Sequence, residues 1–359
     1  MAGCGEDTVT EVRRTVATFA VAAAAASIAA SVARAAPPSP SEIDPVVRGA
    51  LARHLKFSAS DLSDLQRGRV VKHGLDAKAP GEVAVAGAAR VAASKAAFLA
   101  AARDIVRFKS GPAVLQIGRF GSPPAIDDLA ALTVDKEDFD PTTCRVGDCD
   151  VRLPADTIRR LPLEIDPTGP TVRAQAAAWF KRTLLADVLA YVSGGPGRFT
   201  QYDDGDRPIN PIVEFAGVLK ATPAIDALVP GLSDHLARFP AARIADAEDF
   251  LYWSKETFGS APFISVTHVT MVCPSARTCV MTTKDVYSSR YIDASLALAI
   301  VTDAAANGDV IDVVYANRSR VNALKGMLSG QRMALVERRI RGTMEQSLNA
   351  IKSRLERPR

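Results

Sequence analysis

Four strand-like segments follow one another closely between residues 261 and 315, and they constrain the fold more than any other part of the chain. They cover residues 261–272, 278–287, 295–302 and 310–315, and each is rich in valine, isoleucine, threonine and aromatic residues. Strand-like runs separated only by short turns are typical of antiparallel hairpins. The segments therefore predict an antiparallel meander in which each strand pairs with the next.

Further strands and helices are predicted before this meander. Residues 82–93 alternate between apolar and other side chains, as in a half-buried strand, and Ser94 is placed to cap a helix over 95–108. Other predicted strands cover 69–72 and 113–120, and two short helices are expected within 45–68. These elements indicate a mixed sheet-and-helix domain.

Three longer stretches carry helical periodicity. Residues 171–192 repeat apolar side chains every three or four positions, and residues 211–239 do so with breaks at Pro223 and Pro230. The third stretch, 319–355, predicts a long C-terminal helix, because its apolar residues also recur at helical spacing. Before the first of these stretches, residues 127–154 are acidic and predicted to form loops.

The four cysteines after residue 36 form two close pairs, Cys144 with Cys149 and Cys273 with Cys279. The second pair flanks a turn between two predicted strands, so a disulfide there would close a hairpin. An even number of closely paired cysteines suits an oxidising compartment. Unpaired thiols are the alternative. A zinc site is disfavoured because neither pair has a histidine at metal-binding spacing.

The N-terminus has the order of a secretory signal. Arg13 and Arg14 precede an uncharged, alanine-rich run over 15–32, and Ala33 and Ala35 occupy the positions that a signal peptidase reads. This predicts cleavage near Ala35 and export to the periplasm or the outside of the cell. An uncleaved membrane anchor is the alternative, although alanine gains little from a bilayer.

Charge and motifs exclude several classes of function. The net charge of +4 over 359 residues gives no basic patch for nucleic acid. The chain contains none of the common catalytic or nucleotide-binding signatures. We therefore predict no metal and no cofactor, and the sequence does not indicate an oligomeric state.

The order of the predicted elements resembles the helix-grip fold of START-type lipid-binding domains and polyketide cyclase-like proteins, the SRPBCC group. The resemblance implies an α+β domain over about 69–356, in which an antiparallel sheet grips a long C-terminal helix with a cavity between them. Residues 36–68 would form a linker and short helices, and about 121–260 a large helical insertion. Four stretches are also similar to uncharacterised exported bacterial proteins: 114–120, 144–154, 252–259 and 315–321.

His268 is the strongest candidate for chemistry. It lies within the strand-like segment 261–272, on the same side as Ile264 and Val266, because side chains two apart share a face. If that side lines a cavity, the imidazole could act as a general base or orient a ligand. A structural role is the alternative, since the other side of the strand is equally apolar. The remaining histidines, including His235, are expected in exposed helices or loops.

Several polar and aromatic residues are candidates for contacting a ligand. Two cations and two phenols cluster within residues 284–291, after the cysteine-flanked turn, and could bind an anionic group. Trp253 begins a stretch of aromatic and charged residues. Sheet-surface pairs and solvated turns are the plainer alternatives. The predicted ligand-binding set is Lys284, Tyr287, Tyr291, Arg318 and Trp253.

These observations favour an exported binding protein that holds a small apolar ligand, a lipid or a polyketide-like molecule, with a few polar residues for orientation. A cyclase- or hydrolase-like enzyme using His268 as acid or base is the first alternative. An envelope interaction protein is the second. Arginines 338, 339 and 341 could also contact the surface of an anionic membrane.

Overall fold

The computed structural model describes residues 43–194, 201–204, 207–258, 261–321, 342 and 344–356. The predicted signal peptide, the cleavage site near Ala35 and arginines 338, 339 and 341 lie outside the described residues. Among those that are described, no helix combines the length and the apolar character needed to cross a bilayer.

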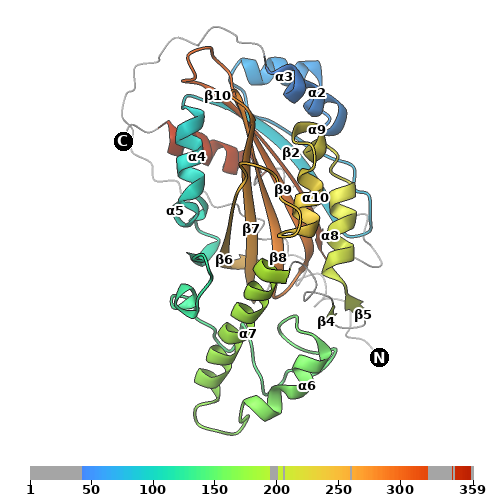
Figure 1. The fold of residues 1–359 in the computed structure, drawn as a ribbon, viewed down its shortest axis with the longest axis vertical. Helices are drawn as coiled ribbons and strands as arrows, with labels where there is room; N and C mark the ends of the chain where they lie inside the picture. The colour runs from blue at the N-terminus through green and yellow to red at the C-terminus, as the bar shows by residue number, and fades with distance from the viewer. Residues whose placement is uncertain are drawn as a thin grey trace, which may run out of the picture.

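A single antiparallel sheet of eight strands organises the molecule, in the order β1-β2-β10-β9-β8-β7-β6-β3 (Figure 1). The predicted meander is confirmed, because each strand from β6 to β10 pairs with the next along the chain. The strands are β1 (Val71–Gly74), β2 (Glu82–Val91), β3 (Val114–Arg119), β6 (Glu248–Phe258), β7 (Ala261–Ser275), β8 (Thr278–Ser288), β9 (Ile292–Asp303) and β10 (Ile311–Val321).

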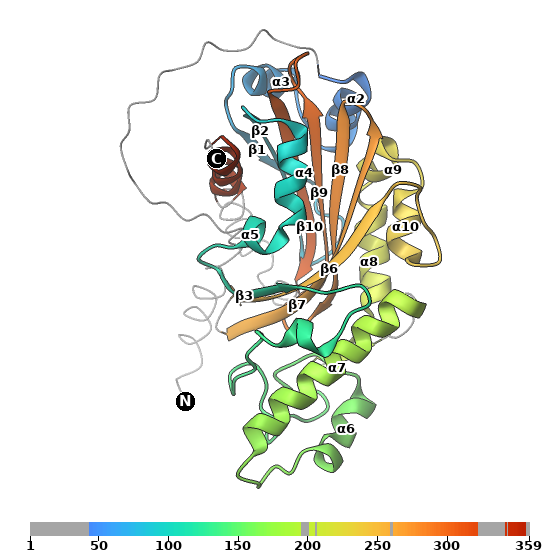
Figure 2. The same cartoon turned by 60° about the vertical axis from the view of Figure 1, so that its left-hand side comes forward.

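Helices cover both faces of this sheet, as Figure 2 shows with the sheet seen nearly edge-on. One face, called here the Lys284 face, packs against helices from the first part of the chain and from the insertion. The other face packs against α4, α5 and the helical residues 344–355. The helices are α2 (Pro45–His54), α3 (Ala59–Gln66), α4 (Lys95–Arg103), α5 (Ile105–Lys109), α8 (Pro211–Lys220), α9 (Ala224–Leu228) and α10 (Leu232–Arg238).

Residues 120–194 and 201–204 form an appendage below the helices of the Lys284 face (Figure 1). Its aromatic core, which includes Phe139, Trp179 and Phe180, is continuous with side chains of β6 and β7. The appendage contains the 3-10 helix η1 (Ile126–Leu129), α6 (Ala155–Glu164) and α7 (Val172–Gly194), and it ends at the two-stranded ribbon of β4 (Tyr202–Asp204) and β5 (Arg207–Ile209).

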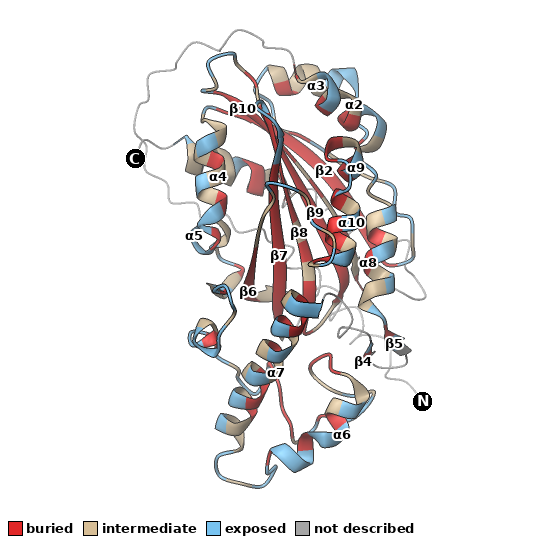
Figure 3. Ribbon diagram, viewed as in Figure 1, coloured by how far each residue is buried: buried red, intermediate tan, exposed pale blue. Residues whose placement is uncertain are grey.

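Cover on both faces corrects the expectation for β2. The alternation within 82–93 predicts a half-buried strand, but all ten residues of β2 are buried (Figure 3). Even the strand's charged residues are enclosed, and they are paired: Glu82 with Arg318, and Arg90 with Asp312. Alternation in this strand therefore reflects side-chain size and type more than exposure.

Two further expectations about the ends of elements need correction, and a third is described only in part. Strand β6 lies inside the predicted insertion, which therefore cannot extend unbroken to residue 260. Residues 319–321 continue β10 and do not begin a helix, because they pair with β2 and β9. Of the predicted C-terminal helix, the described residues show the part over 344–355, and residues 322–341 lie outside the description.

The structure contains both predicted disulfides. Cys144 bonds to Cys149 in a loop of the appendage, and Cys273 bonds to Cys279 across the turn between β7 and β8. The second bond closes the hairpin at the point where Ser275 pairs with Thr278. Each bond limits the freedom of the unfolded chain over a short loop.

Removing the hairpin disulfide should lower stability modestly. We expect the double variant Cys273→Ala/Cys279→Ala to lose about 2 kcal/mol in its free energy of unfolding, as the entropy of closing a loop of this size predicts. Urea unfolding of the oxidised proteins measures the difference. An unchanged midpoint and slope would show that the bond contributes nothing, and the double variant Cys144→Ala/Cys149→Ala provides a matched comparison.

Candidate functional site

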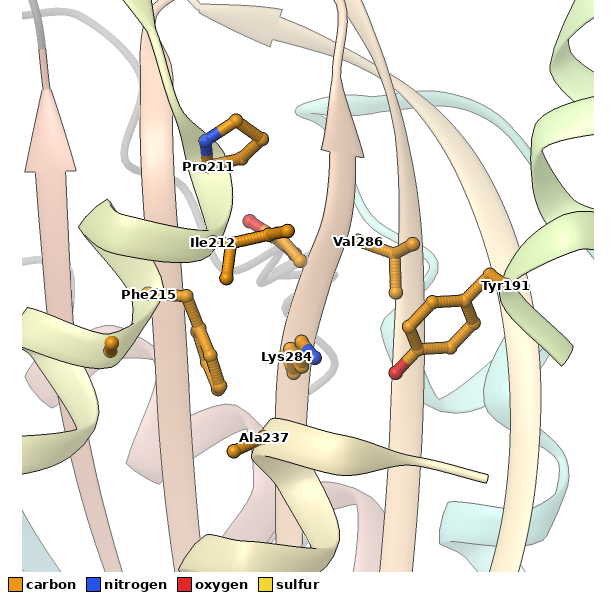
Figure 4. A pocket seen from close by; sticks show the side chains of 9 residues that line it. Tyr191, Pro211, Ile212, Phe215, Ala237, Lys284 and Val286 are labelled. Atoms are coloured by element: carbon orange, nitrogen blue, oxygen red, sulfur yellow. The ribbon is translucent and has the colours of Figure 1, made fainter. Parts of the chain in front are cut away.

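A pocket of about 70 Å³ lies on the Lys284 face of the sheet. Its walls come from the end of α7, from α8 and α10, and from strand β8 beneath them (Figure 4). The lining is mostly apolar, and its polar residues are Lys284, Tyr191 and Asp285, whose carboxyl accepts from Thr267 on the opposite face of the sheet. It consists of Tyr191, Pro211, Ile212, Phe215, Ala216, Ala237, Lys284, Asp285 and Val286.

Local sequence explains how these elements meet. Asn210 caps α8 by accepting hydrogen bonds from the backbone of residues 212 and 213, and Pro211 occupies the first turn, where no amide hydrogen is needed. Beneath α8, a register shift leaves Val286 as an extra residue in β8 opposite β7. Such bulges redirect side chains and are frequent next to functional sites. Here Val286 lines the pocket.

Lys284 is the buried polar centre of this pocket. Its side chain is held by a hydrogen bond from Nζ to the carbonyl of Leu236, 2.7 Å away, and Nζ lies 4.5 Å from the ring centre of Phe215. The Leu236 carbonyl has no helical partner, because the residue four positions later is Pro240, which lacks an amide hydrogen. The lysine supplies the missing donor.

Burial governs the charge of this amine. Only 5% of Lys284 is exposed, and no carboxylate within the described ranges forms an ion pair with it. Removing an ammonium from water without an opposite charge disfavours the charged form. Burial accordingly lowers the pKa of Lys284 from 10.5 to about 7.

A chain of hydrogen bonds begins at the pocket wall with Tyr191. The Tyr191 hydroxyl lies 2.9 Å from Nδ1 of His268, and Nε2 of His268 lies 3.0 Å from Oδ1 of Asp249. An ionised carboxylate can only accept a hydrogen bond, so Nε2 carries the proton and donates to Asp249, which leaves Nδ1 as the acceptor for the phenol. The order phenol, imidazole, carboxylate is a general arrangement for moving a proton to and from a hydroxyl group.

The same carboxylate oxygen is held by two other donors. His235 Nε2 lies 3.0 Å from Asp249 Oδ1, and the Thr270 hydroxyl donates to it at 2.7 Å. Burial opposes ionisation of Asp249, but the hydrogen bonds from both histidines outweigh it and hold the pKa of Asp249 well below its usual range. Burial lowers the pKa of His268, so its neutral form is favoured. It raises the pKa of Tyr191.

Two histidines and one aspartate also form a set that could hold a metal ion, since their ligand atoms lie within 4.8 Å of one another. Binding would require both imidazoles to surrender the protons that Nε2 now directs at Asp249. The set is held together by hydrogen bonds between Nε2 of each histidine and Oδ1 of Asp249, while the buried Nδ1 of His235 has no hydrogen-bond partner in the described part of the chain. We therefore interpret it as a hydrogen-bonded network.

Two of the predicted site residues come together. Lys284 and His268 are direct neighbours across the β7–β8 pair and share one face of the sheet. This settles which side of β7 His268 occupies, because the side bearing Ile264 and Val266 faces α7 and α10. Their roles in chemistry stay predictions.

The other predicted ligand contacts lie elsewhere. Tyr287 and Arg318 line two separate cavities of about 10 Å³, each with room for about one water. Arg318 pairs with Glu82, and the Tyr291 hydroxyl bonds the backbone of Ala261. Trp253 is fully buried and donates from Nε1 to the Asp128 carbonyl at 2.8 Å. These four residues do not share a site.

The sequence pattern does not reveal three members of the network. Tyr191 was expected only as an apolar position of a helix, and Asp249 had no predicted role. His235 was expected to be exposed but is 1% exposed. The signal for His235 was its position between the apolar neighbours Leu232 and Phe239, three and four residues away on one helical face.

The opposite face of the sheet carries a second polar cluster. Lys109 pairs with Glu256, and Ser254 donates to the same carboxylate at 2.6 Å. Nearby, Asp285 accepts from the Thr267 hydroxyl at 2.9 Å, and burial raises the pKa of Asp285 to about 6. The cavity predicted beneath a C-terminal helix would lie on this face, away from the pocket at Lys284.

Comparison with known proteins adds little to this description. No protein-family model matches the chain, and no curated protein matches it. Among solved structures, the ZhuI aromatase/cyclase of Streptomyces sp. R1128 is similar at 13% sequence identity and a TM-score of 0.23. The alignment covers 39% of this chain and 85% of the aromatase/cyclase chain. A TM-score this low does not establish a shared fold, so the architecture rests on the strands and helices themselves.

Replacing the buried lysine should stabilise the protein in a pH-dependent way. Between pH 7 and pH 10.5, Lys284 is protonated in the unfolded chain and mostly neutral in the folded protein, so the free energy of unfolding rises with pH through this window. Below pH 7 the folded protein carries the full cost of burying a charged ammonium. We expect Lys284→Met to raise the free energy of unfolding at pH 7 by about 2–4 kcal/mol, and the gain to shrink towards pH 10.

Urea unfolding at the two pH values measures this effect. Lys109→Met is the matched control: it removes a lysine that is paired with Glu256, so it should destabilise the protein at both values. An equal change for Lys284→Met at pH 7 and pH 10 would contradict an amine with a lowered pKa.

Proposed function

We propose that this protein is an exported binding protein that holds a small, mainly apolar molecule in the pocket between α7, α8, α10 and β8. The observation that carries the proposal is an apolar pocket with one buried amine, Lys284, and one phenol, Tyr191, in its wall. Apolar lining gives affinity through burial, and a few placed polar groups give orientation. Lys284 and Tyr191 would meet a carbonyl, carboxylate or hydroxyl group of the ligand.

The size of the pocket favours a small ligand. Pockets for drug-sized molecules usually enclose about 300–1,000 Å³, whereas this one encloses about 70 Å³. A single ring or a short chain fits this space better than a whole lipid. A cavity between the sheet and a long C-terminal helix would hold a larger molecule, and that arrangement stays a prediction from the order of elements.

Export is the second part of the proposal. The sequence carries the order of a secretory signal, with cleavage near Ala35, and the two disulfides are compatible with an oxidising compartment. The ligand would then be a molecule of the periplasm or of the cell's surroundings.

Filling the pocket should weaken binding. We expect Ala237→Trp to weaken binding of indole by about tenfold or more, because the new ring occupies the space between α10 and Phe215. Saturation-transfer NMR with titrated indole measures the affinity. Ala52→Trp, at an exposed position of α2, is the matched control and should bind indole as the wild type does.

Equal binding by wild type, Ala237→Trp and Ala52→Trp would place the ligand elsewhere and contradict the proposal. Circular dichroism shows whether Ala237→Trp is folded. If it is not, Ile212→Trp, which fills the same pocket from α8, replaces it.

A second candidate function is favoured by one observation, the hydrogen-bonded order of Tyr191, His268 and Asp249 that ends at the pocket wall. It suits a hydrolase- or cyclase-like enzyme in which His268 takes a proton from the phenol. Groups of this kind contribute about 10²–10⁴-fold to a reaction rate.

Hydrolysis of p-nitrophenyl acetate tests this second candidate. We expect His268→Asn to lower the rate by about 10²-fold while indole still binds. Because burial lowers the pKa of His268, any loss of rate caused by protonating His268 should come at a pH below its ordinary pKa of about 6.5. His73→Asn, on β1 and bonded to the Leu55 carbonyl, should leave the rate unchanged. Equal rates for wild type and His268→Asn would contradict the hypothesis that the protein is such an enzyme.

A further inference from the structure

Lys284 differs from the other enclosed lysines in what holds its amine. Lys255 contacts Asp138 at 2.6 Å and Asp135 at 2.9 Å, and Lys109 contacts Glu256. Those ammonium groups have carboxylate partners that fix their charge. The amine of Lys284 has instead a neutral carbonyl at 2.7 Å and two aromatic rings, those of Phe215 and Tyr191, at 4.5 and 5.2 Å.

We propose that Lys284 is a covalent attachment site for an aldehyde or ketone, which it binds as an imine within the pocket. The inference rests on the proposed function, because the carbonyl compound must enter the same pocket as the bound ligand. It assigns a class to that ligand: a small apolar molecule with a reactive carbonyl group.

The chemistry requires only groups that the pocket and the ligand supply. The lone pair of neutral Nζ attacks the carbonyl carbon, and the carbon–oxygen π electrons move to oxygen, which takes up a proton to give a carbinolamine. Nitrogen then loses its protons as the hydroxyl leaves with a proton as water. One carbonyl and one amine give one imine and one water, with no change of oxidation state.

Burial makes this amine nucleophilic at neutral pH. A lysine in an apolar pocket reacts when its charged form is disfavoured, because only the neutral amine has a lone pair to donate. With a pKa of about 7, a large share of Lys284 is neutral at pH 7. An exposed lysine at about 10.4 has a neutral fraction about 10³-fold smaller.

The charged groups around Lys284 leave this behaviour intact. From β7, His268 faces it, and its neutral form is favoured; from α7 comes the Tyr191 phenol, bonded to His268. Asp249 on β6 is engaged by both histidines, including His235 from α10. Asp285, the next residue of β8, bonds Thr267 on the opposite face. Helix α8 contributes the apolar ring of Phe215.

Reductive trapping tests the inference directly. The mature wild-type protein is incubated with butanal and sodium cyanoborohydride for a short time at pH 7, and the modified lysines are located by peptide mass mapping. We expect one butyl group on Lys284 well before the exposed lysines react. The rate at Lys284 should be half-maximal near pH 7, whereas exposed lysines need a pH near 10.

Variants separate this site from general labelling. Lys284→Met should lose the modification. Lys109→Met should still be modified at Lys284, because Lys109 pairs with Glu256 and does not line the pocket. Ala237→Trp should reduce labelling of Lys284 by about tenfold or more, because the tryptophan ring would occupy the space that butanal needs to reach the amine. Excess indole should protect Lys284 in the wild type.

The outcomes distinguish the two proposals. If indole binds but Lys284 stays unmodified, or reacts only with the pH profile of exposed lysines, the imine site is wrong and the binding pocket stands. If indole binds neither wild type nor variants and Lys284 is also unmodified, both proposals fail. Labelling of Lys284 that Ala237→Trp and indole leave unchanged would show access by another route and overturn the imine pocket.

Discussion

Covering both faces of one sheet is the constraint on which the rest of this structure depends. A central strand with helices on each side has no water for its polar side chains, so each must find a partner inside the protein. Arg90 meets Asp312, Arg318 meets Glu82, and Asp249 collects two imidazoles and a hydroxyl. Removing one member of such a pair would leave the other buried and unpaired, which costs more than the pair itself contributes.

Much of the fold could be predicted from the sequence where the local pattern and the structure agree. Strands β7 to β10 are closely spaced runs with strand-forming residues, and helix α7 repeats its apolar residues at helical spacing. Strand β6 was hidden because charged residues, Asp249 and Lys255, occupy its inward positions beside Leu251 and Trp253. Their partners come from distant parts of the chain, which no local pattern reveals.

The same reason limits what could be predicted of the site. His268 was found because a histidine within an apolar strand is unusual, and Lys284 because it lies in a short stretch with a second cation and two phenols. Their closeness could not be deduced, since it depends on the register between β7 and β8 and on the bulge at Val286. Tyr191 and His235 arrive from α7 and α10, and only the packing of those helices on the sheet brings them to Asp249.

The hydrogen bond between Lys284 and the Leu236 carbonyl has a consequence for how the amine is controlled. A carboxylate partner would fix both the position and the charge of an amine. A carbonyl fixes the position alone, since it accepts equally from an ammonium and from a neutral amine. Pro240, by withholding the amide hydrogen that a helix would normally provide, therefore gives the pocket a lysine that stays in place while its protonation changes.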